Sequence, residues 1–167
     1  MRKYLIEARG IHPDVVDKAR QQKLIYSDAR KNAVFVRQGG GVFIRSTNGK
    51  PFKLTVGKDS GAFVVHGDKR LFVSEASINA LSLRAINPGA TVAGTGGNFP
   101  LARIADLVEQ AETVYLCFDN DDAGTRMIEH IRAGLPQFAQ KFVDHQPPAE
   151  FKDWNDVLTG KRRPELP

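Results

Sequence analysis

The sequence predicts an α/β protein: a parallel four-stranded sheet flanked by helices, preceded by a small α+β unit. Three observations support this fold class. Thr113–Phe118 is an unbroken run of apolar and β-favouring residues, typical of a strand buried in a parallel sheet. From residue 70 onward, strand-like runs alternate with helical patterns, which indicates a sheet covered by helices. Residues 1–67 show two short helical patterns followed by short strand-like runs, which indicates an antiparallel sheet.

The N-terminal unit, residues 1–67, is expected to begin with two helices. The first pattern covers Tyr4–Arg9 and is followed by Gly10, a residue that often terminates helices. Pro13 is well placed to open the second helix. Strand-like runs follow at residues 24–26, 33–37, 42–45, 52–56 and 62–65, and Gly39–Gly41 suits a hairpin turn.

The second unit, residues 70–160, is expected to alternate strands and helices. The predicted strands cover residues 71–74, 91–93, 113–118 and 141–144. The predicted helices cover residues 77–84, 100–110, 123–132 and 153–158. Residues 161–167, rich in charge and proline, are expected to form an unstructured tail.

Composition excludes several classes of protein. Hydrophobic residues make up 41% of the chain and charged residues 26%, as in ordinary globular proteins. No stretch approaches the roughly 20 apolar residues that span a bilayer. Cys117 is the single cysteine and lies inside a predicted buried strand, so neither a disulfide nor a zinc ribbon is available. We therefore expect a cytoplasmic protein that does not bind membranes.

The charge is unevenly distributed between the two units. Residues 1–70 hold 15 Lys and Arg against 6 Asp and Glu, whereas residues 71–167 hold 9 against 13. Arg37, Arg45 and Lys53 lie near the predicted turns of the basic unit, where a phosphate backbone could reach them. The pattern favours a nucleic-acid-binding surface beside an acidic site, and the alternative is a solvated basic face without a partner.

Acidic residues and glycines follow the predicted parallel strands. Glu75 follows the first strand, Gly96 and Gly97 the second, and Asp119 and Asp121 the third. The carboxyl ends of parallel strands meet at one edge, where ligands bind in open α/β sheets. Hard cations such as Mg²⁺ or Mn²⁺ suit such a cluster of carboxylates. The alternatives are helix N-caps or a phospho-acceptor aspartate; an EF-hand does not fit, because the segment follows a strand.

Three segments of the second unit resemble motifs of one known family. Leu-Phe-Val-Ser-Glu75 resembles the first motif of a Toprim domain, which topoisomerases, bacterial replicative primases and certain nucleases share. Asp119-Asn-Asp121-Asp-Ala-Gly124 resembles its Asp-x-Asp motif in the primase-like form. Phe-Lys152-Asp153-Trp-Asn155 resembles the segment that ends primase-type Toprim domains. Residues 1–67 resemble the small domain of unknown function that often precedes Toprim in plasmid and conjugative-element proteins.

The resemblance implies roles for individual residues. Glu75 would act as general acid or base, and backbone N–H groups around Gly96 and Gly97 would approach a phosphate. The other implied roles are Mg²⁺ or Mn²⁺ ligands at Asp119, Asp121 and Asp153, a phosphate contact at Lys152, and accessory ligands at Asn79 and Asn155. The two asparagines stand where many relatives carry acids, so the site has two fewer negative charges, which places a second metal ion in doubt.

The function that follows is a Mg-dependent nucleic-acid phosphoryl-transfer module, primase-like or nuclease-like, acting in mobile-element DNA transfer or replication. Its expected partners are DNA, with single strands favoured, or an RNA/DNA hybrid, together with nucleotides and a relaxase or replication protein. The alternative is a non-catalytic DNA-binding accessory or relaxase-associated domain with a degenerate Toprim site. A nucleotide-binding α/β protein is a third interpretation, based only on Gly94–Gly97.

Overall fold

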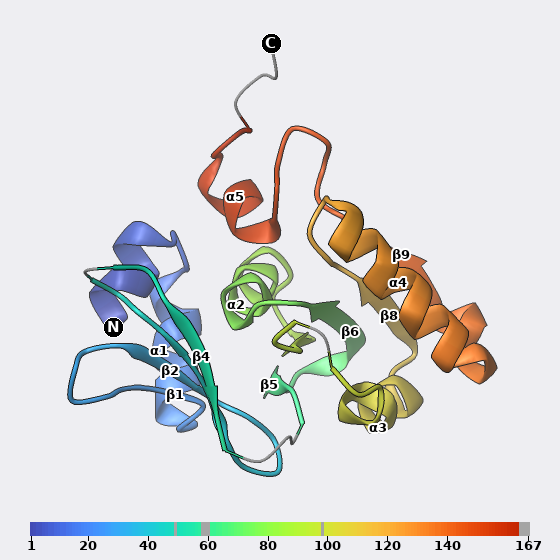
Figure 1. Cartoon of the computed structure of the whole chain (residues 1–167), viewed down its shortest axis with the longest axis horizontal. Coiled ribbons are helices and arrows are strands. Elements are labelled where there is room, and N and C mark those ends of the chain that lie inside the picture. Colours follow the sequence, from blue (N-terminus) through green and yellow to red (C-terminus); the bar gives the residue numbers. More distant parts are fainter. Residues whose placement is uncertain (49, 58–60, 98, 164–167) are drawn as a thin grey trace.

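The computed structural model describes residues 1–48, 50–57, 61–97 and 99–163, and within these ranges one sheet is built from residues 25–56 and another from residues 63–144 (Figure 1). Residues 164–167, the end of the expected tail, lie outside the described residues. The fold class predicted from the sequence is confirmed: a parallel-containing sheet flanked by helices follows a small α+β unit.

The N-terminal unit pairs two short helical elements with an antiparallel sheet. A π-helical turn, η1 (Tyr4–Ala8), precedes helix α1 (Pro13–Gln21), which begins at the proline that the sequence indicated. The four strands lie in chain order, so β4 forms an edge. They are β1 (Ile25–Ser27), β2 (Ala33–Val36), β3 (Val42–Arg45) and β4 (Lys53–Val56).

The second sheet has five strands in the order β5-β7-β6-β8-β9. Its four parallel members are those predicted: β6 (Asp68–Ser74), β7 (Ala90–Gly94), β8 (Thr113–Leu116) and β9 (Phe142–Asp144). The fifth, β5 (Phe63–Val65), pairs antiparallel with β7, whereas the sequence pattern placed it with the N-terminal sheet. All three of its residues are buried, and the second sheet offers this apolar strand two covered faces.

Two apolar clusters cover the two faces of the second sheet. Along β6 the side chains alternate: Phe72 packs in a cluster with α2 (Ser77–Ile86) and the N-terminal unit, and Leu71 and Val73 pack in the other. Helices α3 (Ala102–Gln110) and α4 (Asp122–Gly134) cover that second face. Figure 1 shows α2 on the side of the N-terminal unit and α3 and α4 beyond the sheet. The 3₁₀ helix η2 (Pro136–Lys141) and helix α5 (Trp154–Thr159) complete the chain.

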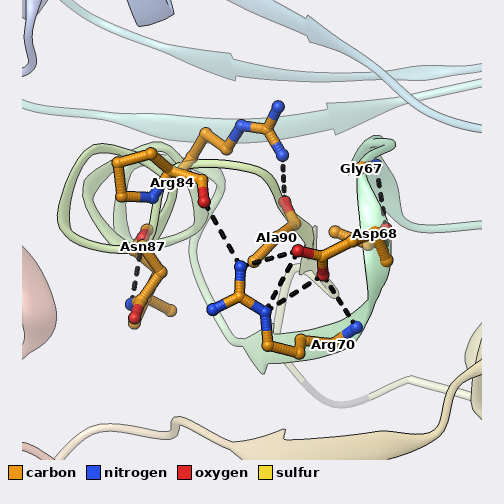
Figure 2. A network of polar contacts seen from close by, with 9 residues as sticks. Gly67, Asp68, Arg70, Arg84, Asn87 and Ala90 are labelled. Atoms are coloured by element: carbon orange, nitrogen blue, oxygen red, sulfur yellow. Dashed lines mark hydrogen bonds and ion pairs between the residues drawn. The ribbon is translucent and has the colours of Figure 1, made fainter.

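A polar network holds the start of β6 against the turn between α2 and β7 (Figure 2). The Arg70 guanidinium donates to Asp68 at 2.6 Å and to the Pro88 carbonyl oxygen at 3.3 Å. The Arg84 guanidinium donates to the carbonyl oxygen of Ala90. These contacts fix the amino-terminal end of the β6–β7 pair, and the functional residues expected from the sequence follow its opposite end.

Candidate metal and nucleic-acid site

The sheet brings three of the expected acidic residues to one edge. Glu75 directly follows β6, and the pairing of β6 with β8 continues as Cys117 donates its backbone N–H to the Val73 carbonyl oxygen at 2.7 Å. This register places Asp119 near Glu75. The backbone N–H of Asn120 then donates to the carbonyl oxygen of Lys152 at 2.9 Å. This contact brings Asp153, the residue after Lys152, to the same edge.

A cleft of about 460 Å³ separates this acidic edge from the N-terminal sheet. Its acidic wall contains Glu75, Asp119 and Asp153. The opposite wall comes from β2, β3 and β4 and contains Phe35, Phe43, Ile44, Arg45, Lys53, Leu54 and Thr55. The basic and acidic halves recognised in the sequence therefore face one another across a single cavity.

Asp121 and Asp153 each cap a helix. The Asp121 carboxylate accepts a hydrogen bond from the Gly124 backbone N–H at 2.9 Å, at the start of α4. The Asp153 carboxylate accepts one from the Asp156 backbone N–H at 2.8 Å, at the start of α5. The capping role that the sequence allowed for Asp121 is thus present, and Asp121 is not among the described residues that line the cleft.

Asp119 lies at the electrostatic centre of the acidic wall. Its Oδ1 accepts a hydrogen bond from Asn79 Nδ2 at 3.0 Å. Burial raises its pKa most, the neighbouring carboxylates, led by Asp153 and Glu75, add to the effect, and the resulting pKa of Asp119 is about 7. The positive charge of Lys152 acts in the opposite sense. A carboxylate held in this environment is stabilised by any cation that binds beside it.

The donor set fits a magnesium-type ion better than a fully protein-coordinated metal. Among the described residues, no group of three His, Cys, Asp or Glu side chains is arranged to hold a metal ion. Mg²⁺ usually takes only one or two carboxylates and completes its shell with water and phosphate oxygens. Asp119 and Asp153 both line the cleft and can supply such a pair.

The basic side chains predicted to bind nucleic acid divide into two groups. Arg45, Lys53 and Lys152 line the cleft, and Lys53 Nζ lies 3.8 Å from Glu75 Oε1. Arg37, in contrast, is only 2% exposed. Its guanidinium donates to the Gly61 carbonyl oxygen and stacks over a phenylalanine ring of β3, so the expectation that Arg37 lies at the surface is wrong.

The two glycines of the β7 loop occupy different surroundings. Gly96 lines the cleft, but its backbone N–H donates to the Glu75 carbonyl oxygen at 2.7 Å, so that group already has a partner. Gly96 has φ +82°, and a Cβ there would meet the Phe43 ring at 2.3 Å. Gly97 has φ +87°, and a Cβ there would lie 3.7 Å from Glu75 Oε1. This loop therefore packs closely against both walls of the cleft.

The first turn of α2 lies close to the end of β7. A Cβ on Gly94 would lie 2.8 Å from Ser77 Cα, so the end of β7 admits this turn only because position 94 is glycine. The turn places Asn79 beside Asp119, within hydrogen-bond distance. It also contributes Ser77 and its two neighbours to the lining of the cleft.

Asn79 and Asn155 are buried, with 2% and 4% of their surface exposed. Asn79 Oδ1 accepts a hydrogen bond from the Asn155 backbone N–H, and both amide groups have protein partners. Sequence reasoning missed the contact from Asn79 to Asp119. It also missed the apolar part of the wall formed by β3 and β4, where Ile44 and Leu54 face each other across the two strands. The available signal was that these two apolar residues lie on neighbouring strand-like runs.

Two family models match this chain. A family model described as Toprim-like matches residues 72–158, which include Glu75, Asp119 and Asp153. The chain belongs to the Toprim-like family. A model described as a protein of unknown function, DUF3991, matches residues 3–69. The Toprim-like match covers the acidic edge, and the second match covers the basic sheet that faces it.

Solved primase structures share the fold. The primase fragment of the bacteriophage T7 primase-helicase aligns with TM-score 0.66 and 24% identity, covering 92% of this chain and 67% of that one. A DnaG primase catalytic domain bound to single-stranded DNA aligns with TM-score 0.64 and 16% identity, covering 97% and 70%. A chain from a bacteriophage T7 assembly of lagging-strand DNA polymerase with primase domains bound to an RNA/DNA hybrid and dTTP gives 0.59 and 21%, covering 92% and 83%.

No curated protein matches the sequence of this Toprim-like chain. Across the described ranges, none of its helices is long and apolar enough to cross a membrane.

The raised pKa of Asp119 predicts how stability depends on pH in metal-free protein. Because the folded pKa of about 7 exceeds the ordinary 3.8, the folded state binds the proton more tightly, and the protein loses stability as pH rises from about 4 to 7. Asp119→Asn should therefore raise the thermal midpoint at pH 8 by a few degrees, at roughly 2–4 °C per kcal/mol. At pH 4 the two proteins should melt together. Calorimetry with a chelator present measures both, and an equal shift at both pH values would contradict the assignment.

Proposed function

We propose that this Toprim-like protein is a Mg-dependent nucleic-acid phosphoryl-transfer module of the primase-like or nuclease-like type. The observation that carries the proposal is the cleft, in which Glu75, Asp119 and Asp153 face Arg45 and Lys53. One wall suits a cation and the other suits a phosphate backbone. A nucleic-acid strand between them would have its phosphates beside the acidic edge only when a cation bridges the two.

Each residue has a defined part in this proposal. Asp119 and Asp153 would hold the Mg²⁺ or Mn²⁺ ion, which supplies charge stabilisation at a phosphate oxygen when bound. Asp121 holds the start of α4 and adds negative charge to the edge. Glu75, about one third exposed, would transfer a proton as general acid or base. Lys152, exposed at the same edge, would contact a phosphate.

The proposed partners follow from the same cleft. Single-stranded DNA is favoured, and an RNA/DNA hybrid and nucleotides are further candidates, because primase structures with the same fold contain such ligands. The setting that we propose is DNA transfer or replication of a plasmid or conjugative element in the cytoplasm, beside a relaxase or replication protein. Support for the setting comes from the succession of a DUF3991 unit and a Toprim-like unit in one chain.

One observation favours a second function, a non-catalytic DNA-binding accessory or relaxase-associated domain. Asn79 and Asn155 replace possible acidic ligands, and both are engaged by protein groups. An acidic edge with fewer charges binds a second ion less readily. Such a domain would bind DNA through the basic wall without turnover, so the two functions differ in their response to metal and to loss of Glu75.

The metal site is tested by removing its two charges from the cleft. Asp119→Asn combined with Asp153→Asn should weaken Mn²⁺ binding at least about 100-fold, because an amide oxygen is an uncharged and poorer ligand for a hard cation. Isothermal titration calorimetry measures the affinity. The control combines Asp14→Asn with Asp106→Asn, which removes two exposed carboxylates outside the cleft. Equal Mn²⁺ affinity in the two double variants would exclude Asp119 and Asp153 as ligands.

Glu75→Gln tests catalysis directly. With labelled single-stranded DNA, ribonucleotides and Mg²⁺ or Mn²⁺, primer synthesis or cleavage should fall by about 10²-fold or more, while the melting temperature changes little. Glu112→Gln, which removes an exposed carboxylate paired with Lys69, is the matched control. Metal-dependent activity that survives Glu75→Gln would remove Glu75 from the mechanism. No activity in the unaltered protein, with DNA binding present, would favour the accessory domain.

The basic wall is tested through the salt dependence of DNA binding. Arg45→Ala with Lys53→Ala should weaken single-strand binding and reduce the slope of log K against log salt by about 1.4, because each phosphate that a cation neutralises adds roughly 0.7 to that slope. Fluorescence anisotropy at several salt concentrations measures the slope. Lys3→Ala with Lys18→Ala removes the same charge from exposed positions outside the cleft. If both pairs change the slope equally, the basic wall is not the binding surface.

A further inference from the structure

A chain of hydrogen bonds connects the N-terminal segment to the acidic wall. Arg9 Nη1 donates to Asn155 Oδ1 at 3.3 Å, and Asn155 Nδ2 donates to the Arg9 carbonyl oxygen at 2.7 Å. The Asn155 backbone N–H donates to Asn79 Oδ1 at 3.3 Å, and Asn79 Nδ2 donates to Asp119 Oδ1 at 3.0 Å. We call these four residues, Arg9, Asn155, Asn79 and Asp119, the amide relay.

The polarity of the relay is fixed by its chemistry. A backbone N–H only donates, so Asn79 must turn Oδ1 toward Asn155, which leaves Nδ2 to donate to Asp119. Asn79 and Asn155 are almost fully buried, so an amide deprived of its partner would remain unsatisfied at a cost. Asn79 thus holds Asp119 Oδ1 in place, at a residue that lines the cleft.

Arg9, at the end of the relay farthest from Asp119, is also fixed by contacts within the protein. The Arg9 Nε donates to the Tyr4 hydroxyl at 2.8 Å, and its guanidinium lies over the Tyr4 ring. Gly10 packs so closely on α5 that a Cβ there would lie 2.9 Å from Thr159 Cγ2. Asn155 Nδ2 also donates to a serine hydroxyl of α2 at 3.0 Å, which ties α5 to α2. Arg9 and Gly10, which directly follow η1, therefore help to hold the acidic edge in place.

From this geometry we propose that Asn79 and Asn155 are positioning residues, through which Arg9 of the N-terminal unit fixes the Asp119 carboxylate for cation binding. This inference rests on the proposed function, since it assigns a purpose to the contact with Asp119. The N-terminal unit would then have a second role, supporting Asp119, in addition to supplying the basic wall of the cleft. Outer partners of metal-binding groups typically change metal affinity by about 10- to 100-fold when removed.

A double-mutant cycle on Mn²⁺ affinity tests the relay. Asn79→Ala should weaken binding about 10-fold, and Arg9→Ala about threefold, a typical size for coupling carried through intervening residues. In the Asn79→Ala background, Arg9→Ala should have no further effect, because the link to Asp119 is already broken. Arg2→Ala is the matched control, since it removes one cation from the same segment, where Arg2 pairs with Asp17.

Additive effects of the two changes, or an effect of Arg9→Ala equal to that of Arg2→Ala, would overturn the relay. NMR of the Asn79 side-chain amide supplies a readout that does not depend on metal. Its Nδ2 resonance should shift in Arg9→Ala protein that remains folded, and should stay unchanged in Arg2→Ala. If Asp119 and Asp153 prove not to bind Mn²⁺, the proposed function loses its metal site. The relay is then judged on this resonance alone, and an unshifted signal contradicts it.

Discussion

The parallel pairing of β6 with both β7 and β8 is the constraint on which the site depends. Leu71 and Val73 point to one apolar cluster and Phe72 to the other, so burial on both faces sets the register of β6. A slip by one residue would exchange the two sets of side chains. Because the register is fixed, Glu75 and Asp119 end on the same edge, and α2 begins two residues after Glu75. The N-terminal unit packs against α2 through one of these clusters, and its sheet thereby closes the other side of the cleft.

Much of this arrangement could be predicted from the sequence because it depends on local signals. The alternating strand and helix patterns predict the parallel sheet. The rule that ligands bind at the carboxyl ends of parallel strands predicts that Glu75 and Asp119 lie at one edge. The counts of charged residues predict that one half of the chain is basic and the other acidic. The relative placement of the halves could not be predicted, because it depends on packing between residues far apart in the chain. The same limit explains Arg37, whose buried guanidinium is matched by the Gly61 carbonyl and the Phe43 ring, and β5, whose partner strand lies in the second unit.

Asn79 and Asn155 show most clearly the difference between what the local sequence predicts and what packing between distant residues decides. In the sequence they resemble weakened metal ligands, since each stands where an acid is expected. In the fold each amide uses both its donor and its acceptor within the protein, and together they connect helices α2 and α5 to Arg9. An amide at position 79 also avoids adding a further carboxylate to Asp119 and its acidic neighbours, where like charges already repel. If the two amides act as the positioning residues proposed above, the feature that suggests a degenerate site would instead keep Asp119 in place.

The electrostatics of the cleft bear on the choice between the two proposed functions. A surface that only binds DNA gains nothing from carboxylates facing its phosphates, because each such charge opposes binding. Here Glu75, Asp119 and Asp153 face the cavity, and burial together with their mutual repulsion raises the pKa of Asp119 to about 7. A cation between the acidic wall and a phosphate removes both costs at once, since it satisfies the carboxylates and attracts the phosphate. The same carboxylates that weaken a purely DNA-binding role therefore favour a metal-dependent one, in which the basic wall of Arg45 and Lys53 would hold the strand in reach.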